Sequence, residues 1–404
     1  MTCSIIIPVF NQLPFTEACL SAVFRTLPAN VGVEVIVVDN GSTDGTAEFL
    51  QRAAAENGLL RIRSVGCNAG FSKACNLGAE AARGDYLLFL NNDTIPLQGW
   101  LTHLLITAAS ADVGVVGPKL VYPQSNTINH AGYVYNADLH AFYPIYHREP
   151  ADFHGVTKER HFQAVLGACL LVKRGAFVAA GKFVHYGLED VDLCLKICQR
   201  GLRVVYNPLS VVLHHGSVTL SQSPPGTIPL ADTRGFEERW PRHLLESDDE
   251  RFYREDGFSV RSMRDGQVEL DENITESDRL VHQALAPGSL SPASPNENAL
   301  RKALELYPHN VRALHALMTL HRRRGDCEEA LRCAEILRRV EPGNLERHLT
   351  AVELAFLSGL RERAAQILEY VGRFPHLPQA ISERVGLLRG KITELQQLKV
   401  GNHR

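Results

Sequence analysis

No apolar run in this sequence reaches the ~18 residues that a membrane-spanning helix requires, so we expect no transmembrane segment. Basic residues are not in excess either, since 42 Lys and Arg stand against 45 Asp and Glu. Binding to nucleic acid normally requires a basic stripe, and its absence excludes that class of partner. The first apolar run ends at Pro8 with no basic residues before it, which predicts a buried strand and not a signal peptide.

Paired cysteine spacings are also missing. The nine cysteines are an odd number and none stand as Cys-x-x-Cys, a pattern that favours reduced thiols over a disulfide framework. Cys194 and Cys198 lie one helical turn apart, where core packing is favoured over a metal or redox pair. Together with the lack of a spanning segment, this predicts a cytoplasmic protein, free or held peripherally at the inner face of the membrane.

The composition that remains is that of a globular protein, with 45% hydrophobic and 22% charged residues. A chain of 404 residues exceeds what one core usually supports, so we expect two domains or more. Short apolar runs rich in Val, Ile and Leu alternate with helical patterns in the first hundred residues; the runs are Ser4 to Val9, Val33 to Val38 and Tyr86 to Leu90, and the helices Thr16 to Phe24, Thr46 to Ala55 and Lys73 to Ala82. This order predicts an α/β fold with a doubly wound parallel sheet, whose ligands bind at the carboxyl ends of the strands.

The C-terminal part repeats itself. Pro308, Asn310, Gly325 and Ala330 recur 34 residues later as Pro342, Asn344, Gly359 and Ala364. That period is typical of tetratricopeptide helix-turn-helix repeats, although a non-repetitive helical bundle remains open. Asp326 and Glu329 have the spacing of a capping box. We therefore predict an α/β domain over 1–245, a lid or linker segment over 246–295, and an all-α tetratricopeptide-like domain over 296–404.

Four motifs follow the predicted strands and helices in chain order: Ser4 to Asn11, Val37 to Thr46, Leu90 to Asp93 and Glu189 to Leu193. In order and spacing the set resembles the family 2 inverting glycosyltransferases of GT-A fold, over about the first 240 residues. The resemblance implies an enzyme that transfers one sugar from a nucleotide-sugar donor. In the related enzymes, the positions equivalent to Asp39, Asn11 and Asn92 contact that donor.

The residues themselves suit a nucleotide. Asp39 can accept a hydrogen bond from a uracil or thymine N–H or a ribose hydroxyl, while Pro8 and Phe10 supply apolar wall, so we expect a UDP- or dTDP-sugar. A helix cap or an Asx-turn is the alternative role for Asp39. Asn68, Gly70 and Lys73 precede or open a helix whose N-terminus attracts phosphate, and by resemblance they form the second nucleotide-binding loop.

Metal binding is implied by the resemblance. Related enzymes hold Mn²⁺ or Mg²⁺ on the diphosphate with an Asp-x-Asp motif, and here Asn91 replaces its first acid, which leaves Asp93 as the ligand. His214 or His215 corresponds to the family's late histidine, and His214 fits the spacing better. Five further histidines, in the irregular stretch between these motifs, fit no zinc spacing, so we expect scattered surface or acceptor-loop side chains; they are His130, His140, His147, His154 and His161.

The chemical step requires a base. Asp190 matches the family's catalytic base, Glu189 is expected to bind hydroxyls of acceptor or donor, and Asp192 to anchor the loop. Helix capping is the alternative for Glu189 and Asp190. Gly167 and Ala168 either leave room for sugar or serve packing. Gly235 to Trp240 is similar to the QxxRW motif of processive synthases, except that Phe236 replaces the Gln.

The acceptor is open: a glycan, a lipid-linked sugar or a protein, the last because helical repeats suit extended peptides. A different class of function is a non-catalytic scaffold or binding protein with the same fold, to which the change at Asn91 would conform. A nucleotidyltransferase is a third hypothesis, but the Gly-rich phosphate loop expected near its N-terminus is missing.

Overall fold

The structure is a computed structural model that describes residues 1–139, 141–184, 188–216, 233–241, 244–264, 267–285 and 296–401. The chain divides into two units, one of residues 1–156 and 160–247, the other of residues 157–159 and 248–404. The second unit is therefore discontinuous in sequence. The predicted domain boundaries at 245 and 296 stay a prediction.

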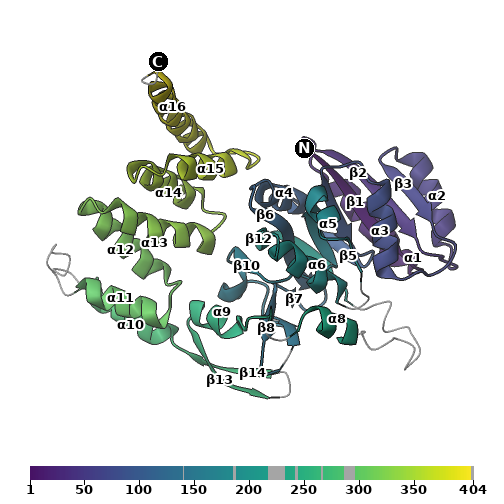
Figure 1. The fold of residues 1–404 in the computed structure, drawn as a ribbon, viewed down its shortest axis with the longest axis horizontal. Coiled ribbons are helices and arrows are strands. Elements are labelled where there is room, and N and C mark those ends of the chain that lie inside the picture. Colours follow the sequence, from purple (N-terminus) through teal and green to yellow (C-terminus); the bar gives the residue numbers. More distant parts are fainter. Residues whose placement is uncertain are drawn as a thin grey trace. The chain divides into compact units, whose positions relative to one another are not determined.

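The first unit is built on a mixed sheet (Figure 1). In the described residues this sheet has ten strands, with the path β10-β12-β6-β11-β4-β1-β2-β3, and with β5 beside β12 and β7 beside β6. Its strands are β1 (Thr2–Val9), β2 (Gly32–Asp39), β3 (Leu60–Ser64), β4 (Tyr86–Leu90), β5 (Thr94–Pro96), β6 (Val113–Tyr122), β7 (Thr127–His130), β10 (Arg160–Phe162), β11 (Cys169–Lys173) and β12 (Arg203–His214). The hairpin β8 (Tyr133–Asn136) and β9 (Ala141–Pro144) lies apart from it.

Consecutive residues of the central strands face two different cores. On β1, Ile5 and Ile7 belong to one hydrophobic cluster and Ile6 to another. The first cluster includes residues of α1 (Leu13–Thr26), α2 (Thr46–Glu56) and α4 (Trp100–Ala108), and the second residues of α3 (Phe71–Ala81), α5 (Arg174–Ala179) and α6 (Glu189–Cys198). Side chains alternate across a strand, so a strand without polar alternation is buried on both faces. The expected α/β sheet with helices on both faces is confirmed.

The sheet departs from the expected parallel order at β11 in its interior and at the short strands β5, β7 and β10, all of which pair antiparallel. The strands β1, β2, β3 and β4 run parallel, but β11 lies antiparallel between β4 and β6. The reason is that the chain returns from β6 through short strands and hairpins, which permit a reversal, instead of through a crossover helix. As a result, the start of β11 meets the carboxyl end of β4: Cys169 pairs with Leu90.

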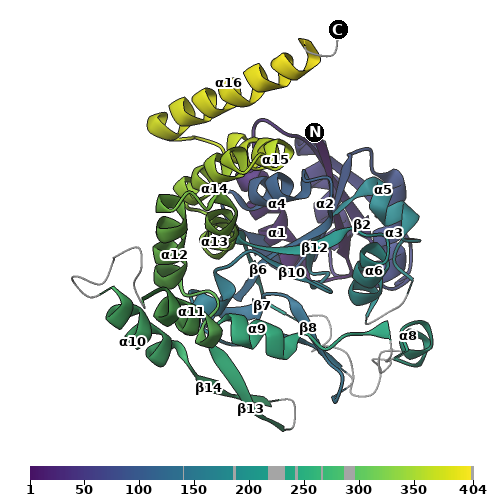
Figure 2. The same ribbon diagram turned by 60° about the vertical axis from the view of Figure 1, so that its left-hand side comes forward.

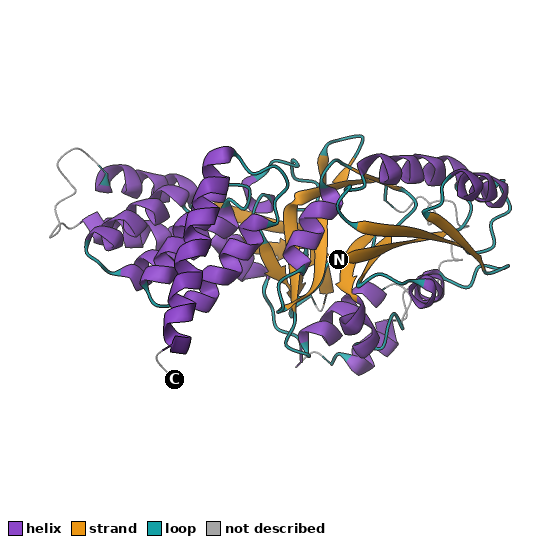
Figure 3. Cartoon of the chain, turned by 90° about the horizontal axis from the view of Figure 1, so that it is seen from above, coloured by secondary structure: helices purple, strands orange, loops and turns teal. Residues whose placement is uncertain are grey.

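The second unit contains α9 (Asp249–Glu255), the hairpin β13 (Phe258–Arg264) and β14 (Gln267–Glu272), and α10 (Ile274–Ala284). These elements occupy a segment in which we expected little regular structure; the weak apolar pattern there hid short elements that bury few side chains each. Helices follow, as Figure 3 shows in purple: α11 (Asn296–Leu306), α12 (Val311–Arg323), α13 (Cys327–Val340), α14 (Leu345–Leu357), α15 (Arg361–Gly372) and α16 (Gln379–Gly401). The expected all-α C-terminal region is confirmed.

The helices keep the 34-residue period of the sequence. Residues Val311 and Leu345 begin α12 and α14, and Cys327 and Arg361 begin α13 and α15. Consecutive helices pack against one another, as the green to yellow ribbon in Figure 2 shows. Between the paired helices, Gly325 and Gly359 both take positive φ, 78° and 77°, a conformation that favours glycine.

Candidate active site

The first loop of the site joins the ends of β1 and β2. The backbone N–H of Asn11 donates to Ser42 Oγ at 2.8 Å, and the side-chain Oδ1 of Asn11 accepts from the backbone N–H of Thr43 at 2.8 Å. Asn11 has a φ of 57°, a left-handed conformation that Asn tolerates better than most residues. Pro8 lies in β1 and Phe10 directly follows it, both half-buried. The loop is thus held by its own polar side chains.

Asp39 ends β2 and is buried. Its Oδ1 accepts from the backbone N–H of Ser42 at 2.9 Å, so the turn-forming role that we left open is present. The next residue, Asn40, connects to the second loop: its Nδ2 donates to Asn68 Oδ1 at 2.9 Å, and its Oδ1 accepts from the backbone N–H of Ala69 at 2.9 Å. Asn40 was not among our candidate residues, yet it ties the two expected nucleotide loops together.

The second loop opens α3. Gly70 precedes the helix with a φ of 84°, and Lys73 lies exposed in the first turn. The backbone N–H of Gly70 donates to Asn68 Oδ1 at 3.1 Å, which shapes the approach to the helix. A helix N-terminus with a nearby ammonium group attracts anions. Asn68, Gly70 and Lys73 therefore lie together as expected.

The third loop follows β4 and contains Asn91, Asn92 and Asp93. The backbone N–H of Asn91 donates to the carbonyl of Ala168 at 2.9 Å, which joins this loop to the start of β11. Asn92 Nδ2 donates to Thr16 Oγ1 on α1 at 3.0 Å. The Oδ1 atom of Asn91 is buried and has no hydrogen-bond partner within the described residues. An unused carbonyl oxygen thus stands where related enzymes carry an acid.

Asp93 and His214 face each other. Pairing of β12 with β5 places His214 opposite Thr94, and Asp93 Oδ1 lies 3.4 Å from His214 Nε2. Both side chains are buried. His214 Nδ1 lies 2.8 Å from Asn129 Oδ1, which accepts a hydrogen bond from the ring. When the ring carries only that one proton, Nε2 presents a lone pair to the carboxylate, and Nε2 has no hydrogen-bond partner in the part of the chain that the structure describes.

These two atoms fit a divalent cation. Two electron-pair donors that face each other across 3.4 Å are stable together when a positive charge lies against both. Imidazole nitrogen with carboxylate oxygen is a ligand pair that Mn²⁺ accepts. Among the described residues no group of three or more His, Cys, Asp or Glu side chains could hold a metal, so further ligands would have to come from substrate and water. His215 instead receives a hydrogen bond from Gln124 Nε2 and contacts the ring of Phe15.

Asp190 lies on the first turn of α6 and is buried. Its Oδ2 accepts from the backbone N–H of Gly167 and its Oδ1 from that of Val191, both at 2.8 Å. Burial raises the pKa of Asp190, while these two N–H groups oppose the rise. A Cβ atom at position 167 would lie 3.2 Å from Asp190 Cβ, so glycine permits the close approach. A carboxylate with a raised pKa is a stronger base than an ordinary one.

Glu189 is buried beside Asp190. Its charge contributes to raising the pKa of two other buried groups, Cys75 on α3 and Tyr133 on β8, although burial is the larger cause for both. The Asp190 charge acts on Tyr133 in the same direction. The contact of Asp190 with Gly167 places this pair on the side of the site where β11 begins.

Asp192 has a different role. Its buried carboxylate accepts from Lys196 Nζ at 2.5 Å, from Trp240 Nε1 at 3.0 Å and from Arg239 Nη1 at 3.3 Å. Arg239 ends α8 (Thr233–Arg239), so the carboxylate attaches α6 to the segment that carries the QxxRW-like motif. Three donors thus occupy this carboxylate. This contact agrees with the expectation that Asp192 anchors a loop.

The histidines between the motifs are not all scattered on the surface. His130 is buried, and its pKa is lowered to about 3 by burial and by the charges of His214 and His147. His147 Nδ1 donates to the carbonyl of Asn129 at 3.0 Å. His161 contacts Arg203 instead, and His140 lies outside the described residues. The expectation of surface side chains is wrong for His130, because pairing of β7 with β6, invisible to local pattern, buries it.

The expected site residues thus lie at one edge of the sheet. The ends of β1, β2, β3 and β4, which are neighbouring parallel strands, carry the nucleotide loops and Asp93. The start of β11 brings Gly167 and with it Asp190, and the end of β12 brings His214. Sequence reasoning missed Asn40, Asn129 and His130. No local signal marks Asn129 or His130, since each is recognised only through its partner.

Comparison with known proteins agrees with this geometry. Residues 4–176 match the family described as Glycosyl transferase family 2. These residues form a family 2 glycosyltransferase domain. The chain is 31% identical over 208 residues to the O-antigen biosynthesis protein RfbC of Myxococcus xanthus. This match covers 49% of this chain and 16% of that protein. It is 29% identical over 245 residues to the N-acetylglucosaminyl-diphospho-decaprenol L-rhamnosyltransferase of Mycobacterium tuberculosis, 53% of this chain and 76% of that protein.

A solved structure, GalNAc-T7 with UDP, GalNAc and Mn²⁺, aligns with a TM-score of 0.46 and 18% identity, over 53% of this chain and 44% of that chain. The chain spans 24%, 16% and 41% of the length of the first three curated relatives. No described helix is long and apolar enough to cross a membrane.

Proposed function

We propose that the chain is a glycosyltransferase that moves a single sugar from a UDP- or dTDP-sugar to an acceptor hydroxyl with inversion at the anomeric carbon. The observation that carries this proposal is the buried pair Asp93 Oδ1 and His214 Nε2, which face each other across 3.4 Å at the end of β4. The family 2 domain and the names of its relatives support the class of reaction.

The donor would lie along the ends of β1, β2 and β4. Asp39, Asn11 and the apolar residues Pro8 and Phe10 would contact the nucleoside, and Asn68, Gly70, Lys73 and Asn92 the sugar and phosphates. The links Asn40 to Asn68 and Asn11 to Thr43 support this, because they hold the loops in place before any ligand arrives. A pre-formed site loses less entropy on binding.

Asp93 and His214 would hold Mn²⁺ or Mg²⁺ against the diphosphate, with donor oxygens and water as further ligands. A bound divalent cation neutralises the charge that grows on a departing nucleoside diphosphate. Lys73 and the N-terminus of α3 would add positive potential at the same phosphates. The unpartnered Asn91 Oδ1 supports a further oxygen contact, because related enzymes place a ligand there.

Asp190 would remove the proton of the acceptor hydroxyl. As that oxygen forms a bond to the anomeric carbon, the bond from this carbon to the diphosphate oxygen breaks on the opposite face, and the nucleoside diphosphate leaves with the electron pair. Each oxygen of Asp190 accepts one N–H bond and retains a second lone pair for the proton. Glu189 would bind hydroxyls of acceptor or donor.

The acceptor could be a glycan, a lipid-linked sugar or a protein. The 34-residue helical repeat supports a protein partner or acceptor, since such repeats present surfaces for extended peptides. We propose a cytoplasmic location because all nine cysteines are free, which suits a reducing compartment. The alternative is a non-catalytic scaffold with the same fold, in which Asn91 would reflect the loss of a metal ligand.

The deciding experiment measures nucleoside diphosphate release from UDP- and dTDP-sugars, with Mn²⁺ and with chelator. We expect release with Mn²⁺ that is lost in Asp93→Asn and His214→Gln, and retained in Asp138→Asn, an exposed carboxylate between β8 and β9. Retention of the anomeric configuration in the product, observed by NMR, would reject inversion. No release from any donor by the parent protein would favour the scaffold.

A further inference from the structure

Two adjacent residues on the short strand β7, Asn129 and His130, contact opposite sides of the site. Both are buried, with relative exposures of 8% and 2%. Successive side chains of a strand point to opposite faces, so neighbours on one strand can serve two different partners. Neither residue belongs to the motifs that resemble the family.

Asn129 lies behind the imidazole of His214. Its Oδ1 is 2.8 Å from His214 Nδ1, and an amide oxygen can only accept, so the ring proton is held on Nδ1. This leaves the Nε2 lone pair directed at Asp93. His147 in turn donates to the Asn129 carbonyl at 3.0 Å and fixes the strand. A histidine ligand is generally oriented by such a partner on its other nitrogen.

His130 lies behind the backbone that carries Asp190. Its Nε2 accepts from the backbone N–H of Leu166 at 3.0 Å. The next residue, Gly167, donates its own N–H to Asp190 Oδ2 at 2.8 Å. The imidazole thus fixes the N–H group of Leu166 directly, and through the peptide bond to the next residue it also fixes the position of the Gly167 N–H group. The ring of Tyr133, which is electrostatically coupled to Asp190, contacts His130 edge-on with centroids 4.5 Å apart.

The two histidines therefore need the same tautomer for different reasons. His214 carries its proton on Nδ1 because Asn129 accepts it, and His130 carries its proton on Nδ1 because Nε2 accepts from Leu166. Burial, the largest cause, lowers the pKa of His130 to about 3, which keeps this imidazole neutral and able to accept.

We propose that Asn129 and His130 are positioning residues that β7 supplies to the two halves of the transferase site: Asn129 directs the His214 lone pair to the cation, and His130 sets the Leu166–Gly167 backbone that presents Asp190. The proposal rests on the proposed function for what the two halves do, but the two orientations themselves do not depend on turnover. The strand β7 would then set the distance between the departing nucleoside diphosphate and the base Asp190.

The first experiment reads the tautomers directly. Long-range ¹H–¹⁵N NMR of histidine side chains is recorded on the full chain without metal or donor, and His214→Gln and His130→Gln spectra assign the two signals among 17 histidines. We expect the Nδ1–H form for both residues in the parent. In Asn129→Leu the His214 signal should acquire the Nε2–H form, whereas Asn129→Asp, which keeps an acceptor oxygen, should retain the parent pattern. If His214 in the parent protein has the Nε2–H form, the role proposed for Asn129 is wrong. If His130 in the parent protein has the Nε2–H form, the role proposed for His130 is wrong.

The second experiment separates the two halves. Binding of Mn²⁺ with UDP is measured by electron paramagnetic resonance, and turnover of the donor by kinetics. Loss of an orienting partner generally costs ~10–100-fold in metal affinity, so we expect Asn129→Leu to weaken Mn²⁺ binding by about that factor and Asn129→Asp to restore it. His130→Phe should leave Mn²⁺ affinity and donor KM unchanged but lower kcat by ~100-fold, because the base is displaced.

His130→Gln, whose Oε1 can accept from Leu166, should recover most of kcat. Gln51→Leu, an exposed amide on α2, is the control for both assays. If Asn129→Leu and His130→Phe lower Mn²⁺ affinity and kcat alike, the residues only support folding and the proposal is wrong. If the tautomers are as expected but the parent neither binds Mn²⁺ nor uses a donor, the proposed function fails while the two orientations hold.

Discussion

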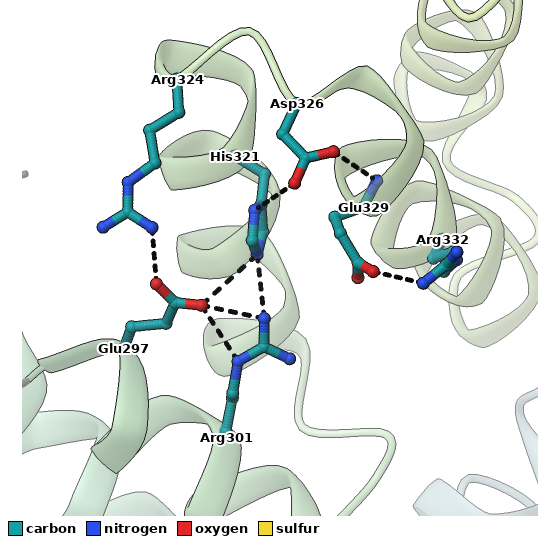
Figure 4. Close-up of polar contacts among 7 residues, drawn as sticks. All are labelled: Glu297, Arg301, His321, Arg324, Asp326, Glu329 and Arg332. Carbon is teal, nitrogen blue, oxygen red and sulfur yellow. Dashed lines mark hydrogen bonds and ion pairs between the residues drawn. The ribbon is translucent and has the colours of Figure 1, made fainter.

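The polar groups at the end of β4 and those at the start of the helical repeat meet opposite surroundings. Beside Asp93, the buried atoms His214 Nε2 and Asn91 Oδ1 lack hydrogen-bond partners among the described residues. Around Glu297, every charge has an opposite neighbour: Figure 4 shows its carboxylate between Arg301 and Arg324, with His321 beyond. His321 continues the chain of contacts to Asp326, at 3.3 Å.

The difference supports the proposed binding role of the groups beside Asp93. A buried polar atom without a partner costs free energy, about 1–3 kcal/mol for a neutral group, so it persists where a ligand supplies the partner. The Glu297 cluster needs no ligand, and its charges lie near the surface, where ion pairs add little stability. Buried atoms without a partner also occur away from this loop, for example Ser358 Oγ in the described helical region, so the contrast is between these two clusters and not between whole regions. Four predictions test this contrast, from the largest effect to the smallest.

The largest effect is expected at the site. Asp190→Asn removes the proposed base and should lower kcat by ~10³-fold, within the range that general-base catalysis contributes. Steady-state kinetics measure it, with circular dichroism as a check on folding. Glu56→Gln at the exposed end of α2 removes an equal charge and should turn over like the parent. Turnover by Asp190→Asn at the parent rate would assign the base elsewhere.

The second effect concerns a matched pair within the second unit. Lys158 Nζ lies 2.5 Å from Asp256 Oδ1, with side chains 3% and 0% exposed. Lys158→Met leaves a buried carboxylate without its counter-ion and should destabilise this unit by about 3–5 kcal/mol. Both tryptophans of the chain, Trp100 and Trp240, lie in the first unit. Far-UV circular dichroism at 222 nm should therefore show an earlier helical transition, and tryptophan fluorescence an unchanged one.

The control and the rescue for this pair are direct. Lys302→Met changes an exposed lysine on α11 and should alter stability by less than about 0.5 kcal/mol. The double variant Lys158→Met with Asp256→Leu replaces the pair by apolar side chains and should recover most of the loss. If the double variant is as unstable as the single one, Lys158 and Asp256 stabilise the unit by more than neutralising each other's charge.

The third prediction uses the raised pKa of Asp190, which burial causes. Catalysis needs the ionised carboxylate, so kcat/KM should fall tenfold per pH unit below a midpoint that lies above about 3.9, the ordinary value for Asp. For stability the sign is opposite. The contribution of this carboxyl to the free energy of unfolding is fully present below the pKa that it has in the unfolded chain. It is lost as the pH rises through the pKa that it has in the folded protein. The stability of the parent relative to Asp190→Asn should therefore decrease with rising pH, and an increase would contradict the raised pKa.

The smallest effect is expected in the Glu297 cluster. Hydrogen bonds from Arg324 and Arg301 lower the pKa of Glu297, so its contribution is present above the unfolded value and is lost as pH falls through the folded one. Glu297→Gln should cost at most about 1 kcal/mol at pH 7, and less at high salt or as the pH falls through the folded-state pKa of Glu297. Chemical denaturation measures it against Glu305→Gln, an exposed neighbour on α11. A loss that salt does not reduce would mean that the cluster is more than a surface network.

Local signals predicted much of this protein. Strands without polar alternation identified the sheet, and β1, β2 and β4 contain the expected runs. Turn and cap chemistry is equally local: Asp326 accepts from the backbone N–H of Glu329 at 3.2 Å and caps α13. The reciprocal half of the capping box is not formed: the backbone N–H of Asp326 donates to the carbonyl of His321 at 3.0 Å, and the Glu329 carboxylate accepts from Arg332.

The remainder depended on long-range pairing. The reversed β11 brings Gly167 to Asp190, and β7 brings Asn129 to His214, a partner 85 positions away. Neither contact leaves a trace in periodicity, because an Asn or a His in an irregular stretch is ordinary on any surface. Motif resemblance found the residues that touch substrate in related enzymes. It could not find the side chains that hold those residues still.

Residues 157–159 belong to the second unit although the chain around them belongs to the first. A gene fragment for 248–404 would encode the helices but omit the lysine that neutralises Asp256. A continuous fragment of the repeat region would therefore contain Asp256 without its partner, and we expect it to be less stable than the same region supplied with residues 157–159.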